Sequence, residues 1–240
     1  MNTELLTVNR DNRYIQSSFQ LTLNEARVLE LAHAKVKFDT DPEPVLEFTA
    51  EEFGQAFNID PRNAYKQLAE GVNQLYERSA DVIGVLATDS LSRFRLASES
   101  HYIESEGRVR IGLTRAMTEL LKVSKDNGGY TGYSLLQVKN LNSTHALRLY
   151  QMMSRYKQTG WAEHSLDDWK FYFGVQDKYP RWADFHRWVL IPAIKNINAV
   201  SNYHIDISGK NKGLKLFKKG RKIDRIKITF TQKDQLLLEL

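Results

Sequence analysis

One short pattern occurs twice in this chain, and it constrains the fold more than any other feature. Residues 49–59 read TAEEFGQAFNI, and residues 165–175 read SLDDWKFYFGV. In register, Thr49 with Glu52 and Ser165 with Asp168 have the spacing of a capping box, in which a hydroxyl and an acid close the start of a helix. Aromatic side chains then recur at i and i+4 and share one helix face. The repeat predicts two short, capped helices of the same kind.

Each short helix is expected between longer helices and ahead of a β-ribbon. Apolar residues at helical spacing predict longer helices over residues 23–36, 61–75, 144–157 and 182–200. Extended, alternating segments predict strands over residues 82–86, 94–103, 109–113, 203–207, 214–217 and 223–230. Helix, short helix, turn, long helix and ribbon is the order of a winged helix-turn-helix.

The sequence therefore predicts an α+β, helix-rich protein made of two tandem winged helix-turn-helix domains. The first is expected over residues 1–130 and the second over residues 140–240, joined near 124–142, where glycines break the periodicity. A chain of 240 residues can hold one large domain or two of about 120 residues. One domain with two coincidentally similar helices is the alternative.

A basic run in the second half resembles a wing that lies on a phosphate backbone. Between Gly209 and Lys222 there is no acid, and the seven basic residues are Lys210, Lys212, Lys215, Lys218, Lys219, Arg221 and Lys222. Like charges this close repel one another unless a polyanion supplies the counter-charge. The run predicts a nucleic-acid contact; a solvated hairpin tip is the alternative.

The charge of the chain is uneven. Residues 141–240 hold 18 Lys and Arg against 9 Asp and Glu, whereas residues 1–140 hold 16 against 20. The second half is therefore the expected anion-binding half, and the first half is expected to have another task as well. The chain has no cysteine, no apolar run near 18 residues and no signal-peptide pattern. These features favour a cytoplasmic protein that is not in a membrane.

Catalytic motifs are missing from the sequence. There is no glycine-rich phosphate loop, and the six histidines are scattered without a metal-binding pair. We therefore expect no enzyme activity, no cofactor and no metal. A nicking or recombining enzyme is the alternative, with Tyr150 or Tyr156 as its nucleophile.

The start of the second long helix is the best base-reading candidate, because these turns enter the major groove in helix-turn-helix proteins. The polar residues there are Lys178, Arg181, His186 and Arg187. Arginine can bond two guanine acceptors at once, although it can also hold phosphates. Trp182 and Trp188 could stack on bases or belong to the core. The matching helix of the first half offers a weaker DNA contact through Arg62, Asn63, Lys66 and Gln67.

Several segments resemble the iteron-binding replication initiators of bacterial plasmids. They are Ala146–Tyr150 with Tyr156, Ser165–Gly174, Phe185–Asn198 and the basic residues 218–222. The most specific is the pattern Val-Leu-x-Pro-Ala-x-x-x-Ile-Asn over residues 189–198. The match covers most of the chain and is strongest over residues 144–230. The chain departs from the family in one place: His186-Arg187-Trp188 stands where the helix often carries several arginines.

The resemblance implies two winged-helix domains. It implies that the C-terminal domain reads part of a repeated origin sequence in double-stranded DNA through Arg181, His186 and Arg187. The N-terminal domain would serve dimerisation and, in the monomer, touch the rest of the repeat. The function expected is that of a plasmid replication initiator that also regulates its own synthesis and recruits host replication proteins, such as a helicase or host initiator. A winged-helix transcriptional repressor is the alternative.

Overall fold

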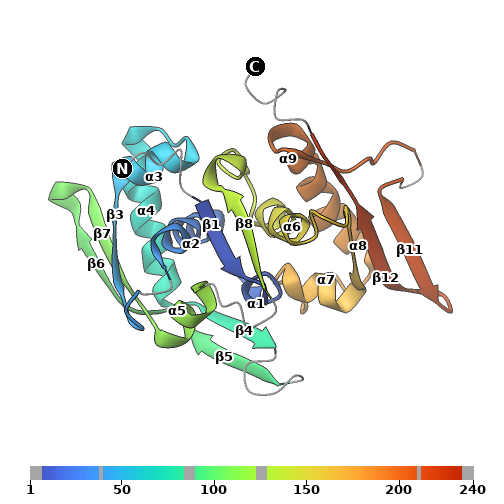
Figure 1. The fold of residues 1–240 in the computed structure, drawn as a ribbon, viewed down its shortest axis with the longest axis horizontal. Helices are drawn as coiled ribbons and strands as arrows, with labels where there is room; N and C mark the ends of the chain where they lie inside the picture. The colour runs from blue at the N-terminus through green and yellow to red at the C-terminus, as the bar shows by residue number, and fades with distance from the viewer. Residues whose placement is uncertain (1–6, 38–39, 84–89, 123–128, 210–211, 234–240) are drawn as a thin grey trace. The chain divides into compact units, whose positions relative to one another are not determined.

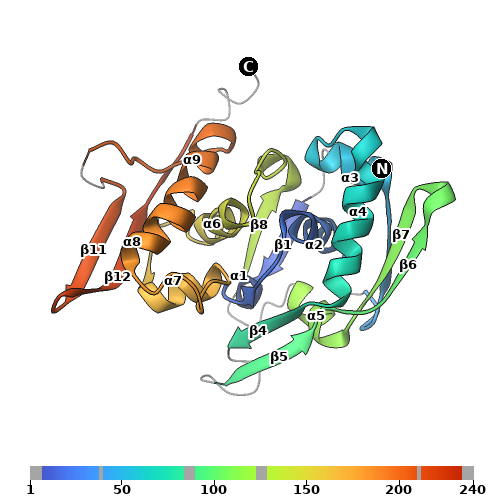
Figure 2. The same ribbon diagram turned by 180° about the vertical axis from the view of Figure 1, so that it is seen from behind.

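A computed structural model of the chain describes residues 7–37, 40–83, 90–122, 129–209 and 212–233. It divides into two compact units, Met1–Asn140 and Leu141–Leu240. Both mix helices with small antiparallel sheets, as Figure 1 and the reverse view in Figure 2 show. No helix among these residues is long and apolar enough to cross a membrane.

The described part of the first unit contains five α-helices and three sheets. Its elements are β1 (Thr7–Asp11), α1 (Asn12–Ile15), β2 (Ser18–Phe19), α2 (Leu23–Lys35), β3 (Val45–Thr49), α3 (Ala50–Phe57), α4 (Pro61–Tyr76), β4 (Ser79–Ile83), β5 (Leu91–Arg95), β6 (Ala97–Ile103), β7 (Arg108–Leu113), α5 (Arg115–Leu121) and β8 (Tyr130–Ser134). Helix α2 packs on α4, and β8 pairs with β1, so this unit continues past residue 130.

The second unit repeats this plan with fewer strands. Its elements are α6 (Thr144–Arg155), β9 (Trp161–Ser165), α7 (Leu166–Tyr172), α8 (Trp182–Phe185), a π-helical segment (His186–Leu190), α9 (Ile191–Val200), β10 (Tyr203–His204), β11 (Leu214–Lys219), β12 (Lys222–Thr229) and β13 (Thr231–Gln232). The helical stretch from α8 to α9 is continuous and matches the expected helix over residues 182–200.

Both units share one topology around the repeated short helix. A strand leads directly into α3 and into α7, and in each case it pairs with the last strand of the wing, giving the sheet orders β3-β7-β6 and β9-β12-β11. Each short helix then ends in a left-handed residue, Asn58 with φ 52° and Gly174 with φ 67°. The next amide bonds back to the helix in the same way, from Ile59 to Gly54 O and from Val175 to Lys170 O.

The aromatic residues of the repeat form the two cores, as their spacing predicts. Phe53, Phe57, Trp169 and Phe173 are all buried. The indole Nε1 of Trp169 also donates to the carbonyl oxygen of Ile226 at 3.0 Å. One side chain thus ties the short helix to the wing of the second unit, and burying this polar group costs little because it has a partner.

Three expectations from the sequence differ from the structure. The predicted strand over residues 94–103 is wrong: the chain breaks at the buried Leu96, so β5 pairs with β4 and β6 pairs with β7. The capping box at Thr49 is half formed, because the Glu52 carboxylate pairs with Lys35 Nζ at 2.9 Å. The predicted strand over residues 203–207 is shorter, and of the predicted strand over residues 82–86 the last three lie outside the described residues.

Candidate nucleic-acid interface

The long helix of the second unit has a buried face and a solvent face. Phe185, Val189, Ala193, Ile194 and Ile197 are buried at helical spacing. Of the predicted reading residues, Lys178, Arg181 and Arg187 are exposed. Lys178 lies in the turn before this helix. The fold therefore leaves the polar start of the helix free to meet a ligand.

A π-helical turn interrupts this helix just before Pro192. The amide of Ile191 bonds to the carbonyl oxygen of His186, five residues back, instead of four. Proline has no N–H to bond the carbonyl of residue 188, and its ring would crowd that turn. The wider π turn is one of the recognised ways in which a helix accommodates such a residue. A proline at position 192 indicates by itself that the helix is interrupted there, but it does not specify the π form.

Aromatic contacts hold two of the reading residues. His186 is half-buried and lies against the Trp182 ring, with ring centroids 5.0 Å apart. Burial lowers the pKa of His186, which therefore favours its neutral form. The Arg187 guanidinium lies 4.8 Å from the centre of the Trp188 ring, and Trp188 is itself 57% exposed. Trp182 thus belongs to the margin of the core, whereas Trp188 faces solvent.

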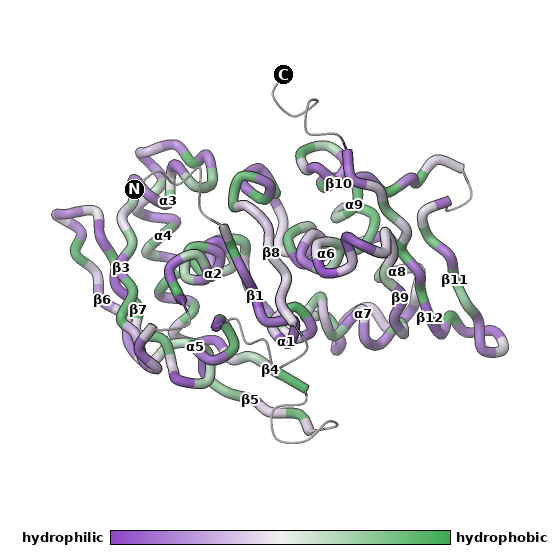
Figure 3. Tube along the Cα trace, in the orientation of Figure 1, coloured by the Kyte–Doolittle hydropathy of each residue, from purple (hydrophilic) through white to green (hydrophobic). Residues whose placement is uncertain are grey.

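The basic run forms the predicted hairpin. Strands β11 and β12 project beyond the helices of their own unit (Figure 1), and the turn between them is strongly hydrophilic (Figure 3). Gly220, at φ 63°, makes the tight turn between Lys219 and Lys222. Lys212, Lys215, Lys218, Lys219, Arg221 and Lys222 are all exposed. Lys210 lies outside the described residues.

The tip and the base of this hairpin differ in how their charges are compensated. At the base, Arg225 pairs with Glu163 at 2.6 Å, Lys227 lies 3.8 Å from the centre of the Trp161 ring, and Lys215 lies against Phe217. At the tip, Lys218, Lys219, Arg221 and Lys222 form no ion pair within the described ranges. The tip therefore carries four cations that have no counter-charge among the described residues.

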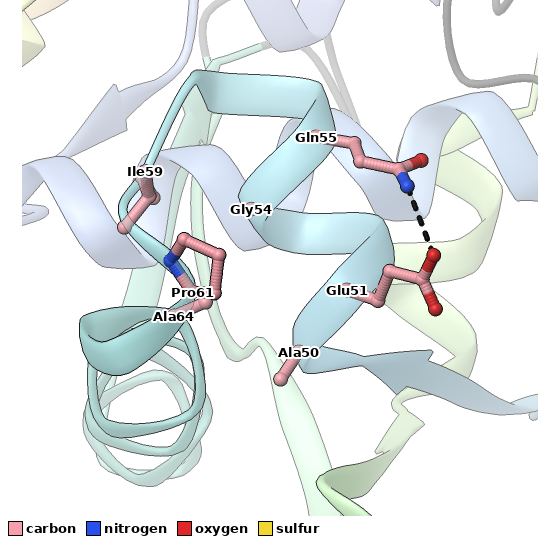
Figure 4. Close-up of a pocket in the computed structure, with 7 residues that line it drawn as sticks. All are labelled: Ala50, Glu51, Gly54, Gln55, Ile59, Pro61 and Ala64. Carbon is pink, nitrogen blue, oxygen red and sulfur yellow. Dashed lines mark hydrogen bonds between the residues drawn. The ribbon is translucent and has the colours of Figure 1, made fainter.

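The first unit presents a smaller polar surface at the matching helix. Arg62, Asn63 and Lys66 are exposed at the start of α4, and Gln67 is half-buried. A shallow cleft of about 580 Å³ opens between α3 and α4, lined by small residues such as Ala50, Gly54 and Ala64 (Figure 4). At its rim Gln55 Nε2 donates to Glu51 Oε1 at 3.0 Å. The cleft belongs to the helix-turn-helix surface and holds few charges.

The wing of the first unit is neutralised by its own acids. Glu47 on β3 pairs with Arg108 at 3.1 Å and with Arg110 at 2.7 Å, and Arg108 also pairs with Glu106. These hydrogen bonds lower the pKa of Glu47 and keep it ionised. The sequence alone does not reveal this network, because Glu47 is distant in sequence from both arginines. The two wings thus differ in charge: the second is basic, whereas the first is neutralised.

Lowering the pH should destabilise the second unit through its histidines. Burial lowers the pKa of His145, His164 and His186 below the ordinary 6.5, so the folded protein holds these rings neutral. The unfolded chain protonates them near pH 6.5, and stability should therefore fall as the pH drops below about 6.5. His164, whose ring packs against Trp169 and Tyr172, has no hydrogen-bond partner at Nε2.

His164→Phe should remove part of this pH dependence. The ring contacts can persist, and the group that acid would charge is gone. Melting curves of both proteins at about pH 7.5 and about pH 5.5 test this. The same change at exposed His204 is the control and should alter the pH dependence little. An unchanged pH dependence in the His164→Phe protein would contradict the role assigned to this ring.

Comparison with known proteins agrees with this architecture. Residues 7–154 match the family model described as Initiator Replication protein, WH1, and residues 165–230 match Initiator Rep protein, WH2. A replication initiation protein of Escherichia coli is 24% identical over 218 residues, which cover 86% of this chain and 66% of that protein. The chain therefore spans about two thirds of the length of that relative. An uncharacterised 27.6 kDa protein of Escherichia coli is 26% identical over 225 residues, covering 85% of this chain and 92% of that one.

A solved structure has the same fold over nearly the whole chain. The crystal structure of the Pi initiator protein in complex with iteron DNA superposes with a TM-score of 0.71 at 24% identity, covering 98% of this chain and 100% of that one. The predicted fold of two tandem winged-helix domains is thereby confirmed. The chain belongs to the family of initiator replication proteins and carries both of its winged-helix parts, WH1 followed by WH2.

Proposed function

We propose that this protein is a plasmid replication initiator that binds direct repeats at the origin as double-stranded DNA. The observation that carries the proposal is the basic hairpin of the second unit, whose tip holds four cations without an ion-pair partner in the described part of the chain. Such a surface attracts phosphates and gains free energy from the counterions that DNA releases. The exposed start of the long helix in the same unit supplies side chains that can reach base edges.

The relatives support the same function. The Pi initiator, which shares this fold, was solved with iteron DNA, and the Escherichia coli relative is a replication initiation protein. Family membership favours initiation over the repressor interpretation, although an initiator that binds beside its own promoter would also regulate itself. Recruitment of a host helicase or host initiator belongs to this proposal.

We propose that the protein acts by binding alone. Tyr150, one of the two candidate nucleophiles, is fully buried, and its hydroxyl donates to Asn202 Oδ1 at 3.0 Å. Within the described ranges no group of three acids or histidines is placed to hold a metal. Incubation with supercoiled origin plasmid and a divalent metal should leave the plasmid closed. Appearance of nicked circles would overturn this part of the proposal.

The direct test is selection of bound fragments from the source replicon, followed by footprinting. We expect protected repeats at a regular spacing. Deletion of these repeats should abolish replication of a plasmid that depends on the protein. Protection of a single promoter site, with replication unaffected, would instead favour the repressor.

We propose that the first unit provides self-association. Its sheet β2-β4-β5 has β5 as an edge strand, and an exposed edge invites pairing with another copy. Leu91 on this edge is 61% exposed, and Ile83, its direct neighbour across the pair, is 46% exposed. These two large apolar residues form a patch that a second copy would cover.

The double variant Ile83→Lys with Leu91→Lys should shift the protein to monomers. The lysines remove the apolar patch and place charge beside the exposed edge, which opposes pairing between copies. Analytical ultracentrifugation of the full chain measures this shift. Val45→Lys, at a residue 50% exposed on another sheet, is the matched control and should leave the distribution unchanged. If only the control dissociates the dimer, the interface lies on the sheet that contains β3.

A further inference from the structure

The two helix-turn-helix units share an ion pair at the start of their long helices. In the first, Arg62 Nε lies 3.0 Å from Asp60 Oδ1, and Arg62 Nη2 lies 2.7 Å from Asp60 Oδ2. In the second, Arg181 Nε lies 2.7 Å from Asp184 Oδ2, and Arg181 Nη2 lies 3.1 Å from Asp184 Oδ1. The aspartate precedes the arginine in one unit and follows it in the other, yet the same edge of the guanidinium is engaged.

This geometry leaves the other edge of each guanidinium available. The pair uses the Nε hydrogen and one Nη2 hydrogen, and the remaining Nη1 and Nη2 hydrogens point outward side by side. The arginine side chains are 88% and 79% exposed, so a ligand can reach this edge. Guanine presents O6 and N7 in the major groove at the spacing that two parallel N–H donors match.

The aspartates also fix a side chain that is otherwise mobile. A free arginine loses much rotamer entropy when it is ordered on binding, and a side chain held in place beforehand loses less. An acid at a DNA-binding surface has a second effect, since it repels phosphates and weakens binding to every sequence. A carboxylate at this position therefore favours base selection over general affinity.

We propose that Asp60 and Asp184 are positioning residues, each holding one arginine ready to read a guanine, one in each winged-helix unit. This inference rests on the proposed function and deepens it. It assigns two guanines in the bound repeat, one read by Arg62 and one by Arg181. It also gives the first unit, whose wing is neutralised, a base-specific contact that does not depend on a basic surface.

A similar arginine–aspartate pair elsewhere in the chain lies away from both helix-turn-helix elements. Arg13 meets Asp11 with distances of 3.1 Å and 3.0 Å at the start of the short helix α1, outside either helix-turn-helix. Asp60 likewise caps its helix by accepting the Arg62 amide at 2.9 Å. Variants must therefore keep the cap. Asn serves as well as Asp at this position and removes only the charge.

The experiment measures binding of the full chain to the footprinted repeat, to each single-base-pair substitution of it and to an unrelated duplex. The proteins are wild type, Asp60→Asn, Asp184→Asn, Arg62→Ala and Arg181→Ala, with Arg13→Ala as the matched control. Wild type should discriminate against loss of each guanine by roughly tenfold or more. Asp60→Asn and Arg62→Ala should lose most of this discrimination at one base pair, and Asp184→Asn and Arg181→Ala at another.

The unrelated duplex separates positioning from a structural role. Both aspartate variants should bind it as well as wild type or more tightly, because a repelling charge is gone. The control should leave the base profile unchanged. An unaltered profile in the aspartate variants, or an equal loss on all sequences, would overturn the inference. A wild-type protein that does not prefer the repeat would instead refute the proposed function, before any variant is compared.

Discussion

DNA binding by this protein should weaken by roughly a thousandfold or more when the salt concentration rises from about 50 to about 200 mM. The hairpin tip and the long helix of the second unit together offer about six to ten phosphate contacts, each of which releases counterions. The effect is large because the four tip cations form no ion pair with any described residue, so all of them are available to phosphates. Binding titrations at a series of salt concentrations measure this effect. The logarithm of the binding constant should fall linearly with the logarithm of the salt concentration.

Replacing Lys218, Lys219 and Lys222 by alanine should reduce the slope of that plot by about three, since each phosphate contact contributes about 0.9. Binding to all sequences should weaken alike, because phosphate contacts carry no base information. A triple variant of lysines outside the hairpin, Lys37, Lys139 and Lys157, makes the same charge change and is the control. A nearly flat salt response in the wild type, or an equal effect of the control, would refute the phosphate-binding hairpin.

Arg10→Met should destabilise the first unit by about 3–5 kcal/mol, the usual cost of leaving a buried charge without its partner. Arg10 on β1 is fully buried and pairs with Glu30 on α2, which is also buried. Tyr133 on β8 donates to the same carboxylate at 3.0 Å, and the Arg10 guanidinium lies 4.6 Å from the centre of the Tyr14 ring. The network thus joins three elements through one carboxylate.

The stability lost in Arg10→Met should return when the other polar groups of the network are also removed. A triple variant, Arg10→Met with Glu30→Leu and Tyr133→Phe, should recover much of the stability, because apolar residues of similar volume often replace a buried ion pair without loss. Urea unfolding at constant pH measures both changes. Arg95→Ala, which breaks a pair with Glu77 that is exposed on both sides, should cost about 1 kcal/mol or less. If Arg10→Met alone lowers the free energy of unfolding by no more than this control does, Glu30 finds another partner or a water molecule.

Much of the fold follows from the repeated capped helix. The register of residues 49–59 and 165–175 predicts the buried aromatics and the winged-helix order, and the structure has both. Strands β3 and β9 were not predicted. They are five residues each, and their pairing partners lie more than fifty residues away, so local periodicity carries little signal of them. The break at Leu96 was missed because Leu96 continues the alternation from Phe94, and only the pairing of β5 with β4 and of β6 with β7 separates the two strands.

The sequence predicts where the candidate site lies, but it does not predict which side chains pair within it. A run of seven cations without an acid indicates a basic hairpin, and the residues at the start of each long helix follow from helix-turn-helix geometry. The pairing of Arg62 with Asp60 and of Arg181 with Asp184 depends on rotamers that sequence does not specify. The neutral wing of the first unit likewise needs the register that brings Glu47 beside Arg110.

The π turn at His186–Leu190 sets the angular phase between the two ends of the long helix. A π turn takes in one additional residue, so the segment before it is rotated about the axis by about 100° relative to an unbroken α-helix. The direction in which residues 181–187 face is therefore governed by a backbone irregularity, while Ala193 and Ile197 remain anchored in the core. If the reading residues of one such helix were placed on another, the base preference would follow only when both helices hold those residues at the same angle about the helix axis.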